Sequence, residues 1–402
     1  MAIIGIDLSP LQSGHRMRGI GATALNVLTN VSDADKQKHT YVFFLYKQNE
    51  SEILELINVA SFNNYEVRYI TQQPPSYLPL KSLKGLRELP RRYKDSRLAK
   101  SLGTRAITDV KDLDVFLQFE QDVIPPKGVN SVVIAYDLIP YILEADYLWS
   151  YSTARHMHHY SRRGALLCHL RRVFYLRNIR TVTRRASRVL AISKQTMLDF
   201  KQYVHVPANK ITLCYLGVNN NVSTDNLNNP ESVTRYVNSQ WGDIESEDTL
   251  PTSPFLLFVG GLDARRKVSE LISAFNQLRA QGHDLHLVLA GDTMNGPNSV
   301  PNPIVKRSLL QSSYLNDIYM LGFVDDSTRE WLYQNALAFV YPSRYEGFGL
   351  PVLEALRYGT PVITSYNSSL KEITNDVVVY ADTGDDIHQK VIELLDDKKY
   401  KV

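Results

Sequence analysis

Cysteine is nearly absent from this 402-residue chain, which contains only Cys168 and Cys214. Two cysteines without metal-ligand spacing cannot build a zinc site or a disulfide framework, so we expect a reducing compartment. No apolar run is long enough to cross a membrane, and the N-terminus lacks the basic start and apolar stretch of a signal peptide. The formal net charge of +3 is too small to indicate nucleic-acid binding. We therefore expect a cytoplasmic protein.

Internal repeats are also lacking, which excludes solenoids and propellers. The length predicts two domains. In the second half, short apolar runs alternate with helical patterns, which predicts a parallel sheet built from βαβ units. The predicted strands are Phe255–Val259, Leu285–Ala290, Ile318–Leu321, Leu337–Tyr341, Pro361–Thr364 and Val377–Tyr380.

The first half shows the same alternation less clearly. Its predicted strands are Ile3–Ile6, Tyr41–Leu45, Glu66–Ile70, Val115–Phe119, Val132–Tyr136, Val189–Ile192 and Ile211–Tyr215. Between the halves the chain becomes polar, and we predict an interdomain linker and surface excursion over residues 219–253 with one short helix around Val233–Trp241. The expected fold is α/β, with two Rossmann-like doubly wound domains, residues 1–218 and 254–402, facing across a cleft.

One nine-residue string carries the most chemistry: Glu346-Gly347-Phe348-Gly349-Leu350-Pro351-Val352-Leu353-Glu354. Its glycines allow the backbone to approach a ligand, and Pro351 fits the first position of a helix that Gly359 ends. The free N–H groups at that helix start form an anion site for a diphosphate. Glu346, a turn carboxylate outside the core, can then accept hydrogen bonds from sugar hydroxyls, and Glu354 can chelate a ribose. The alternative is an acidic turn that caps an ordinary helix.

This string resembles the E-x7-E signature of retaining glycosyltransferases of family 4, which have the GT-B fold. Further segments resemble the family's motifs in the same order, and the resemblance covers nearly the whole chain. These segments are Met17-Arg18-Gly19-Ile20-Gly21, Tyr136-Asp137-Leu138-Ile139-Pro140, Val189-Leu190-Ala191-Ile192-Ser193, Leu216-Gly217-Val218-Asn219 and Phe258-Val259-Gly260-Gly261-Leu262-Asp263. The first of them, with Gly19, Ile20 and Gly21, resembles the family's acceptor-side loop.

The resemblance implies roles for individual residues. Glu346, Asp137 and Tyr136 would be the catalytic group, although Asp137 could instead only cap the chain on its way to Pro140. The diphosphate and donor sugar would be bound by Arg266, Lys267, Gly347, Phe348, Gly349 and Leu350, with Glu354 on the ribose. Transfer would follow the family's front-face course, in which a diphosphate oxygen takes the acceptor proton and no general base is needed.

Three departures from the family pattern are visible. Gly261 stands where the family has an arginine, so Arg265 or Arg266 would have to replace it. Tyr136 stands where many members have a histidine. The family's C-terminal return helix has no counterpart before Val402, so either the chain is truncated or the helix is absent.

The nucleotide base would lie near Val324, Asp326 and Arg329, because an acid and a base placed like Asp326 and Arg329 resemble guanine-reading pairs. Asp325 or Asp326 could equally be a helix N-cap. A GDP-sugar is favoured over a UDP- or dTDP-sugar. No metal or other cofactor is expected, since Asp33-Ala34-Asp35 and Asp112-Leu113-Asp114 are poorly placed as metal sites.

A basic tract lies between Arg155 and Arg188, where arginines alternate with apolar residues and no Asp or Glu occurs. A helix of this kind suits an anionic membrane surface, and the alternative is a solvated face packed on the sheet. A second basic segment spans Lys81–Lys100.

We therefore expect a retaining transferase that moves a hexose, with mannose from a GDP-sugar favoured, to a lipid-linked or glycan acceptor at the inner face of the membrane. The rival hypothesis is a nucleotide-sugar-binding relative without activity.

Overall fold

The computed structural model describes residues 1–14, 16, 19–70, 107, 109–218, 230, 232–239, 242–291 and 294–396. Two compact units make up the chain, Met1–Gly217 and Val218–Val402. The predicted segments Met17-Arg18, Lys81–Lys100 and 219–229 lie outside the described residues. None of the described helices is both long and apolar enough to span a bilayer.

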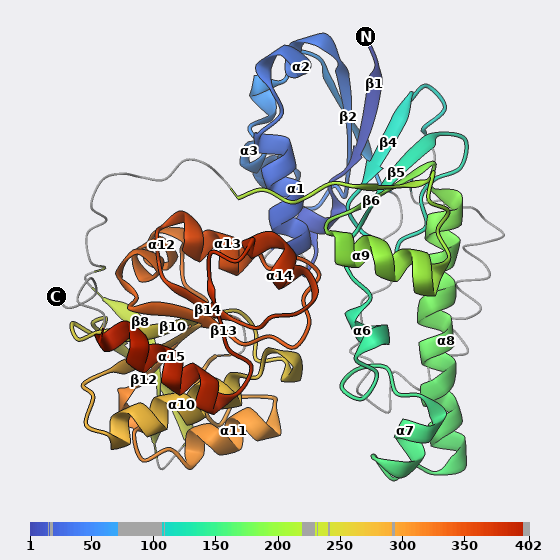
Figure 1. The fold of residues 1–402 in the computed structure, drawn as a ribbon. Helices are drawn as coiled ribbons and strands as arrows, with labels where there is room; N and C mark the ends of the chain where they lie inside the picture. The colour runs from blue at the N-terminus through green and yellow to red at the C-terminus, as the bar shows by residue number, and fades with distance from the viewer. Residues whose placement is uncertain are drawn as a thin grey trace. The chain divides into compact units, whose positions relative to one another are not determined.

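The first unit is built on a seven-stranded parallel sheet with strand order β3-β2-β1-β4-β5-β6-β7 (Figure 1). Its strands are β1 (Ile3–Asp7), β2 (Thr40–Leu45), β3 (Tyr65–Tyr69), β4 (Val115–Gln118), β5 (Asn130–Ala135), β6 (Arg188–Ala191) and β7 (Ile211–Leu213). Its helices are α1 (Gly19–Thr29), α2 (Asp33–Lys38), α3 (Glu50–Leu56), α6 (Ile139–Ile142), α7 (Tyr151–His156), α8 (Arg162–Arg185) and α9 (Lys194–Asp199).

The second unit contains a six-stranded parallel sheet with strand order β12-β11-β10-β13-β14-β15. Its strands are β10 (Phe255–Val259), β11 (His286–Ala290), β12 (Ile318–Gly322), β13 (Ala338–Tyr341), β14 (Val362–Thr364) and β15 (Val379–Tyr380). Its helices are α10 (Val268–Ala280), α11 (Pro303–Leu310), α12 (Asp326–Asn335), α13 (Leu350–Arg357), α14 (Ser368–Thr374) and α15 (Gly384–Asp396).

The parallel sheets follow from the hydrophobic pattern. In β10 the four residues Phe255–Phe258 are all buried, as a strand covered on both faces requires. Helix α10 buries Leu271, Ile272, Phe275 and Leu278 at the helical spacing seen in the sequence. The prediction of an α/β fold with two Rossmann-like sheets is confirmed.

The predicted helix around Val233–Trp241 was wrong. The chain forms an antiparallel hairpin there, with β8 (Val233–Ser239) and β9 (Gly242–Asp248). Strand β8 packs on the edge strand β12, where the Arg235 guanidinium lies 3.8 Å from the Tyr319 ring centroid. A side chain at Gly322 would meet Tyr236 at 2.8 Å, so the glycine makes room for the hairpin.

Each sheet has a topological switch point, where the strand order reverses direction. In the first sheet it lies between β1 and β4, and in the second between β10 and β13. Doubly wound sheets bind ligands outside the carboxyl ends of the strands at such points. A ligand site is therefore expected in the loops that follow β1, β4, β10 and β13.

Candidate functional site

Glu346 lies in the loop that joins β13 to α13, beside the switch point of the second sheet. Its side chain is buried, and its Oε1 accepts hydrogen bonds from the Arg265 guanidinium, the Tyr341 hydroxyl at 3.0 Å and the Ser343 hydroxyl at 2.8 Å. The Arg266 Nε lies 3.7 Å from the same oxygen. Among the described residues, no hydrogen bond reaches Oε2. The expectation of a turn carboxylate outside the core was wrong, because Glu346 is the anion of a buried ion pair.

The charges around Glu346 keep it ionised. Burial alone raises the pKa of this carboxyl, but the Arg265 and Arg266 charges and the Ser343 and Arg265 hydrogen bonds outweigh it and hold the pKa below the ordinary value. A fixed carboxylate whose second oxygen has no hydrogen-bond partner among the described residues can accept hydrogen bonds from ligand hydroxyls. The contact between Glu346 and a donor sugar stays a prediction.

The basic residues after β10 do not share one role. Ala264–Arg266 form a 3-10 turn, Lys267 takes a left-handed conformation at φ 46°, and α10 begins at Val268. Arg266 Nη1 donates to the Gly261 carbonyl at 3.0 Å, and Lys267 Nζ donates to the Asp382 carbonyl at 2.9 Å. Arg266 and Lys267 are the predicted diphosphate ligands, yet it is Arg265 that donates a hydrogen bond to Glu346.

The glycine pair Gly260–Gly261 explains why an arginine is missing from this segment. A Cβ at Gly260 would lie 2.7 Å from Arg266 Nη1, and one at Gly261 would lie 3.2 Å from it. The Arg266 guanidinium therefore occupies space that the absent side chain would need. The proposal that Arg265 or Arg266 takes the place of the family's arginine stays a prediction.

Helix α13 begins where the string predicts a helix start. Gly349 is its N-cap at φ 111°, and a Cβ there would lie 2.7 Å from Leu370, so glycine is required. Leu350 is the first helical residue and Pro351 the second, one position later than predicted. Gly347 is not among the described glycines with positive φ. Ser369 Oγ donates to the carbonyls of Glu346 and Phe348, at 2.9 and 2.8 Å, which fixes the loop against α14.

A second polar cluster forms between α13 and α12. Glu354 Oε2 accepts from the buried Tyr333 hydroxyl at 3.0 Å, and the Glu354 charge acts on Arg329, one turn earlier on α12. Arg329 Nη1 lies 2.9 Å from Asp326 Oδ1. Burial and the Glu354 charge raise the pKa of Tyr333 well above its ordinary value. The structure thus brings Glu354, Arg329 and Asp326 together, as a ribose and base site requires.

The helix cap beside this cluster is Asp325. Its Oδ1 accepts from Thr328 N at 2.7 Å and from the Ser327 hydroxyl, and the hydrogen bond from Thr328 N is the largest effect lowering the pKa of Asp325. Asp326 is 82% exposed at its side chain and has no capping role. Val324 lies partly buried against the core just before the cap. Asp325 is therefore the N-cap, and the exposed Asp326 carboxylate pairs with Arg329 and takes no part in capping.

In the first unit, Tyr136 and Asp137 follow β5. The Gln121 side chain bridges this backbone, since its Oε1 accepts from Tyr136 N and its Nε2 donates to the Asp137 carbonyl, both at 2.7 Å. Asp137 Oδ1 accepts from Ile139 N at 2.9 Å, so the local capping role does occur. Gln121 belongs to no motif, and only its place after a predicted strand could have indicated it. Catalytic use of Asp137 stays a prediction.

The Tyr136 side chain faces α1, whose first turn contains Gly19, Ile20 and Gly21. Burial raises the pKa of the Tyr136 hydroxyl, which lies near Thr23 of α1 but has no hydrogen-bond partner among the described residues. Thr23 Oγ1 in turn donates to the Gly19 carbonyl at 2.7 Å. The predicted acceptor-side loop and the predicted catalytic tyrosine are therefore neighbours in the first unit.

Two buried carboxyl groups at the first switch point were missed in the sequence. Asp7 ends β1 and Glu120 lies two residues beyond β4, and both are almost fully buried. Burial, followed by the charges of Asp7 and Asp122, raises the pKa of Glu120 to about 8. Glu120 therefore carries a proton at neutral pH. These two groups come close together because β1 pairs with β4, and this strand order cannot be derived from the local sequence.

The two Asp-x-Asp triplets have structural partners. Asp33 and Asp35 lie in the first turn of α2, and Asp35 N donates to the Ser32 hydroxyl that caps this helix. Asp112 forms an ion pair with Arg68 at 2.7 Å, and Asp114 accepts from Ile3 N.

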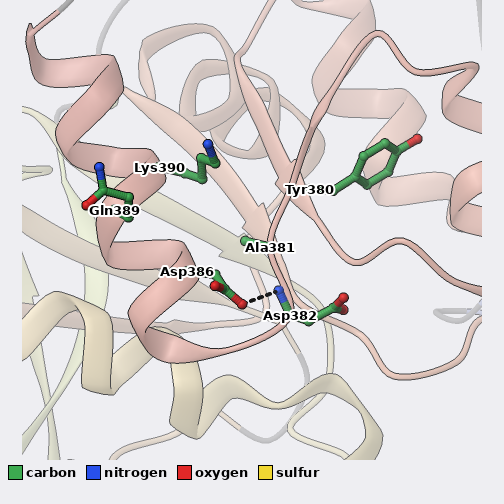
Figure 2. A pocket seen from close by; sticks show the side chains of 6 residues that line it. All are labelled: Tyr380, Ala381, Asp382, Asp386, Gln389 and Lys390. Carbon is green, nitrogen blue, oxygen red and sulfur yellow. Dashed lines mark hydrogen bonds between the residues drawn. The ribbon is translucent and has the colours of Figure 1, made fainter.

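A cavity of about 430 Å³ lies between the loop after β15 and helix α15. Figure 2 shows the Asp386 carboxylate directed at the Asp382 backbone N–H, with Gln389 and Lys390 one turn further along the helix. Asp386 also caps Thr383, so the acidic group here serves the start of α15. Lys267 reaches this loop through the Asp382 carbonyl.

Comparison with known proteins gives the geometry a family context. Residues 240–402 match the family model described as "Glycosyl transferases group 1". Over 149 residues the chain is 31% identical to O-antigen chain mannosyltransferase B of Escherichia coli, covering 37% of this chain and 38% of that protein. It is 24% identical over 247 residues to the serotype-specific mannosyltransferase WbdA of Escherichia coli, covering 61% of this chain and 26% of that protein.

Among solved structures, sucrose-phosphate synthase from Thermosynechococcus elongatus aligns with a TM-score of 0.58 at 17% identity, over 100% of this chain and 91% of that one. The chain spans about two fifths and one quarter of the lengths of the two mannosyltransferases. The structural likeness shows the fold, which is GT-B, and the sequence matches support a glycosyltransferase.

Proposed function

We propose that this protein is a retaining glycosyltransferase that transfers a hexose from a nucleotide sugar to a lipid-linked or glycan acceptor in surface polysaccharide or glycolipid synthesis. The observation that carries the proposal is the pair of carboxylates on either side of the α13 start. Glu346 is held charged beside Arg265 and Arg266, and Glu354 is held by Tyr333. The likeness to bacterial mannosyltransferases favours mannose as the hexose.

The leaving diphosphate would be stabilised by fixed positive groups. The N–H groups at the start of α13 and the Arg266 guanidinium supply positive charge near Glu346. In the proposed front-face course, the acceptor hydroxyl attacks on the leaving-group side, the bond from the anomeric carbon to the diphosphate breaks, and a diphosphate oxygen takes the proton. Glu346 Oε2 would accept hydrogen bonds from the donor sugar. Neither a general base nor a metal is part of this mechanism.

The nucleoside would bind at the cluster between α12 and α13. Glu354 would chelate the two ribose hydroxyls, and Asp326 and Arg329 would meet the base edge beside Val324. An exposed carboxylate and a cation, paired at 2.9 Å, match the N–H donors and the carbonyl acceptor of guanine. We therefore favour a GDP-sugar, with a UDP- or dTDP-sugar as the alternative.

The first unit would supply the acceptor side. Tyr136 and Asp137, together with the first turn of α1, form its proposed contribution. Gln121 holds the backbone of Tyr136 and Asp137, and Thr23 of α1 lies near the Tyr136 side chain. Peripheral contact with an anionic membrane at the cytoplasmic face is proposed from the arginines of α8.

Incubation with a panel of sugar nucleotides, followed by measurement of nucleotide release, tests the proposal. We expect release of GDP from GDP-mannose in the presence of a glycan acceptor, in buffer that contains a chelator. Thermal stabilisation without turnover for every donor would instead identify a non-catalytic nucleotide-sugar-binding protein. The reason for this rival hypothesis is Tyr136, which stands where many members of the family have a histidine.

A further inference from the structure

Helix α8 exposes one face whose two halves differ in chemistry. Leu166 and Val173 in the N-terminal half are 51% and 45% exposed. Arg177 and Arg184 in the C-terminal half are exposed as well. At 3.6 residues per turn, these four side chains fall within about 40° of one another around the helix axis. The face is therefore a single stripe, apolar at one end and basic at the other.

The basic end of the stripe is hollowed. A cavity of about 560 Å³ there is lined by Arg177, Arg180 and Arg184, with Thr181 and the apolar Val173 and Leu176 beside them. Arg180 Nη2 donates to the Tyr203 carbonyl at 2.8 Å, which fixes that side chain in the wall. A head group can thus be surrounded by cations and a hydroxyl on one helix.

The positive charge in this cavity has little compensation from the protein. No Asp or Glu occurs between Arg155 and Arg188. Arg172, which also lines the cavity, forms an ion pair with Glu144 at 3.3 Å, whereas Arg177 and Arg184 form none with the described residues. Uncompensated cations that converge on a cavity attract an anion of matching size.

Further exposed apolar side chains lie on α7 and just after it. Helix α7 packs on the N-terminal half of α8 through Ala154, Ala165 and Cys168 (Figure 1). Beyond this contact, Tyr151 is 41% and Met157 is 63% exposed. Between Val173 and Leu166, about 10 Å along the helix, a hydrocarbon chain would meet the apolar part of the stripe, and the exposed Arg162 and Arg163 lie beyond Leu166 at the helix start.

We propose that this stripe binds one phosphate-bearing lipid, with its phosphate among Arg177, Arg180 and Arg184 and its hydrocarbon chain along Val173 and Leu166 towards Met157. The proposal rests on the proposed function, because it supplies the transferase with a site for the lipid-phosphate part of its acceptor. A nucleic acid would match the arginines but leave the apolar half uncovered. Free phosphate would also leave the apolar half uncovered. Only a ligand with both a phosphate and a hydrocarbon chain matches both halves of the stripe.

Calorimetric titration of the full chain with soluble amphiphiles below their micelle concentration tests this site. Dodecyl phosphate carries both the phosphate and the hydrocarbon chain. Inorganic phosphate carries the anion alone, and dodecyl maltoside carries the chain without a charge. We expect dodecyl phosphate to bind at least about tenfold more tightly than either single-group probe, since each buried methylene adds to affinity.

Matched variants assign the two halves. Arg177→Gln with Arg184→Gln is expected to weaken dodecyl phosphate at least about tenfold, because charge-assisted hydrogen bonds are lost. Lys38→Gln with Lys47→Gln removes the same charge from exposed positions elsewhere and is expected to have no effect. Leu166→Ser with Val173→Ser is expected to weaken dodecyl phosphate and leave inorganic phosphate unchanged. Leu198→Ser is the control for an exposed leucine.

Three results would overturn the proposal. Equal affinity for inorganic phosphate and dodecyl phosphate would reduce the site to an anion site, and equal affinity for dodecyl maltoside would remove the role of the arginines. Binding to anionic vesicles without binding to monomeric dodecyl phosphate would show a membrane-docking surface. Thermal stabilisation by GDP is measured on the same samples. Its absence would count against the proposed function alone, whereas an α8 variant that keeps the GDP response and loses dodecyl phosphate isolates this site.

Discussion

Replacing Glu346 by alanine is expected to destabilise the second unit as well as to stop transfer. The carboxylate is buried and receives hydrogen bonds from Arg265, Tyr341 and Ser343. Its removal leaves Arg265 buried without its carboxylate, and breaking a buried pair in this way costs about 3–5 kcal/mol. For a unit of this size about 2–4 °C of melting temperature is lost per kcal/mol, so we expect a fall of roughly 6–20 °C.

The isosteric Glu346→Gln separates charge from shape. An amide oxygen can still accept from Tyr341 and Ser343, so we expect a smaller fall in melting temperature. Because the pKa of Glu346 is lowered in the folded state, its stabilising effect is present above the ordinary value of 4.5 and is lost as the pH falls through the folded value. The wild type should therefore lose this contribution on acidification below 4.5, and Glu346→Gln should not.

Calorimetric melting at neutral and at acidic pH measures both effects. Nucleotide release at saturating donor reports transfer in the same variants under conditions where each is folded. An alanine variant with the wild-type melting temperature and wild-type turnover would refute both the ion pair and the donor-site assignment.

Four further outcomes are expected. Glu354→Gln should weaken nucleotide binding in a titration and change turnover at saturating donor much less, because the ribose contact is made in the ground state and the transition state alike. Arg329→Ala should remove the larger thermal shift given by GDP over UDP and keep the shift given by pyrophosphate; a preference that survives would place the base elsewhere. Because the pKa of Glu120 is raised to about 8 in the folded protein, the free energy of unfolding falls as the pH rises from 4.5 to 8. Urea unfolding should thus show Glu120→Gln more stable than the wild type at pH 8.5, with the difference absent at pH 4. Gly349→Ala should cost about 1–3 kcal/mol of unfolding free energy, since φ is 111° and Leu370 fills the space; an unchanged denaturation midpoint would contradict this.

The sheets could be predicted from sequence because their strands are continuously apolar. β10 begins and ends at the predicted residues, and the others differ by a residue or two at their ends. The hairpin β8–β9 was missed because its alternation of polar and apolar residues is weak and its partner, β12, lies about 80 residues further along the chain. Its packing depends on the glycine at position 322, which gives no local signal in the hairpin itself.

In the candidate site too, features set by local sequence could be predicted and features set by distant residues could not. The α13 start was predictable, since Gly349 and Pro351 have local conformational preferences. The burial of Glu346 was not, because it depends on Arg265, 81 residues away along the chain. Asp7 and Glu120 come together only through the crossover that places β4 beside β1. Pairings set by tertiary topology leave no mark on local sequence.

The central claim is that the Glu346 and Glu354 clusters bind a nucleotide sugar for transfer with retention. The most direct measurement incubates the full chain with GDP-mannose, in which the sugar is α-linked, and a mannose-terminated glycan, and follows GDP release and the anomeric signals of the product by NMR. We predict GDP release at a rate that Glu346→Gln lowers on the order of a hundredfold, the effect of losing one charge-assisted contact of up to about 3 kcal/mol, and a product that is α-linked. A β-linked product would contradict retention, and a Glu346→Gln variant with wild-type turnover would contradict the site.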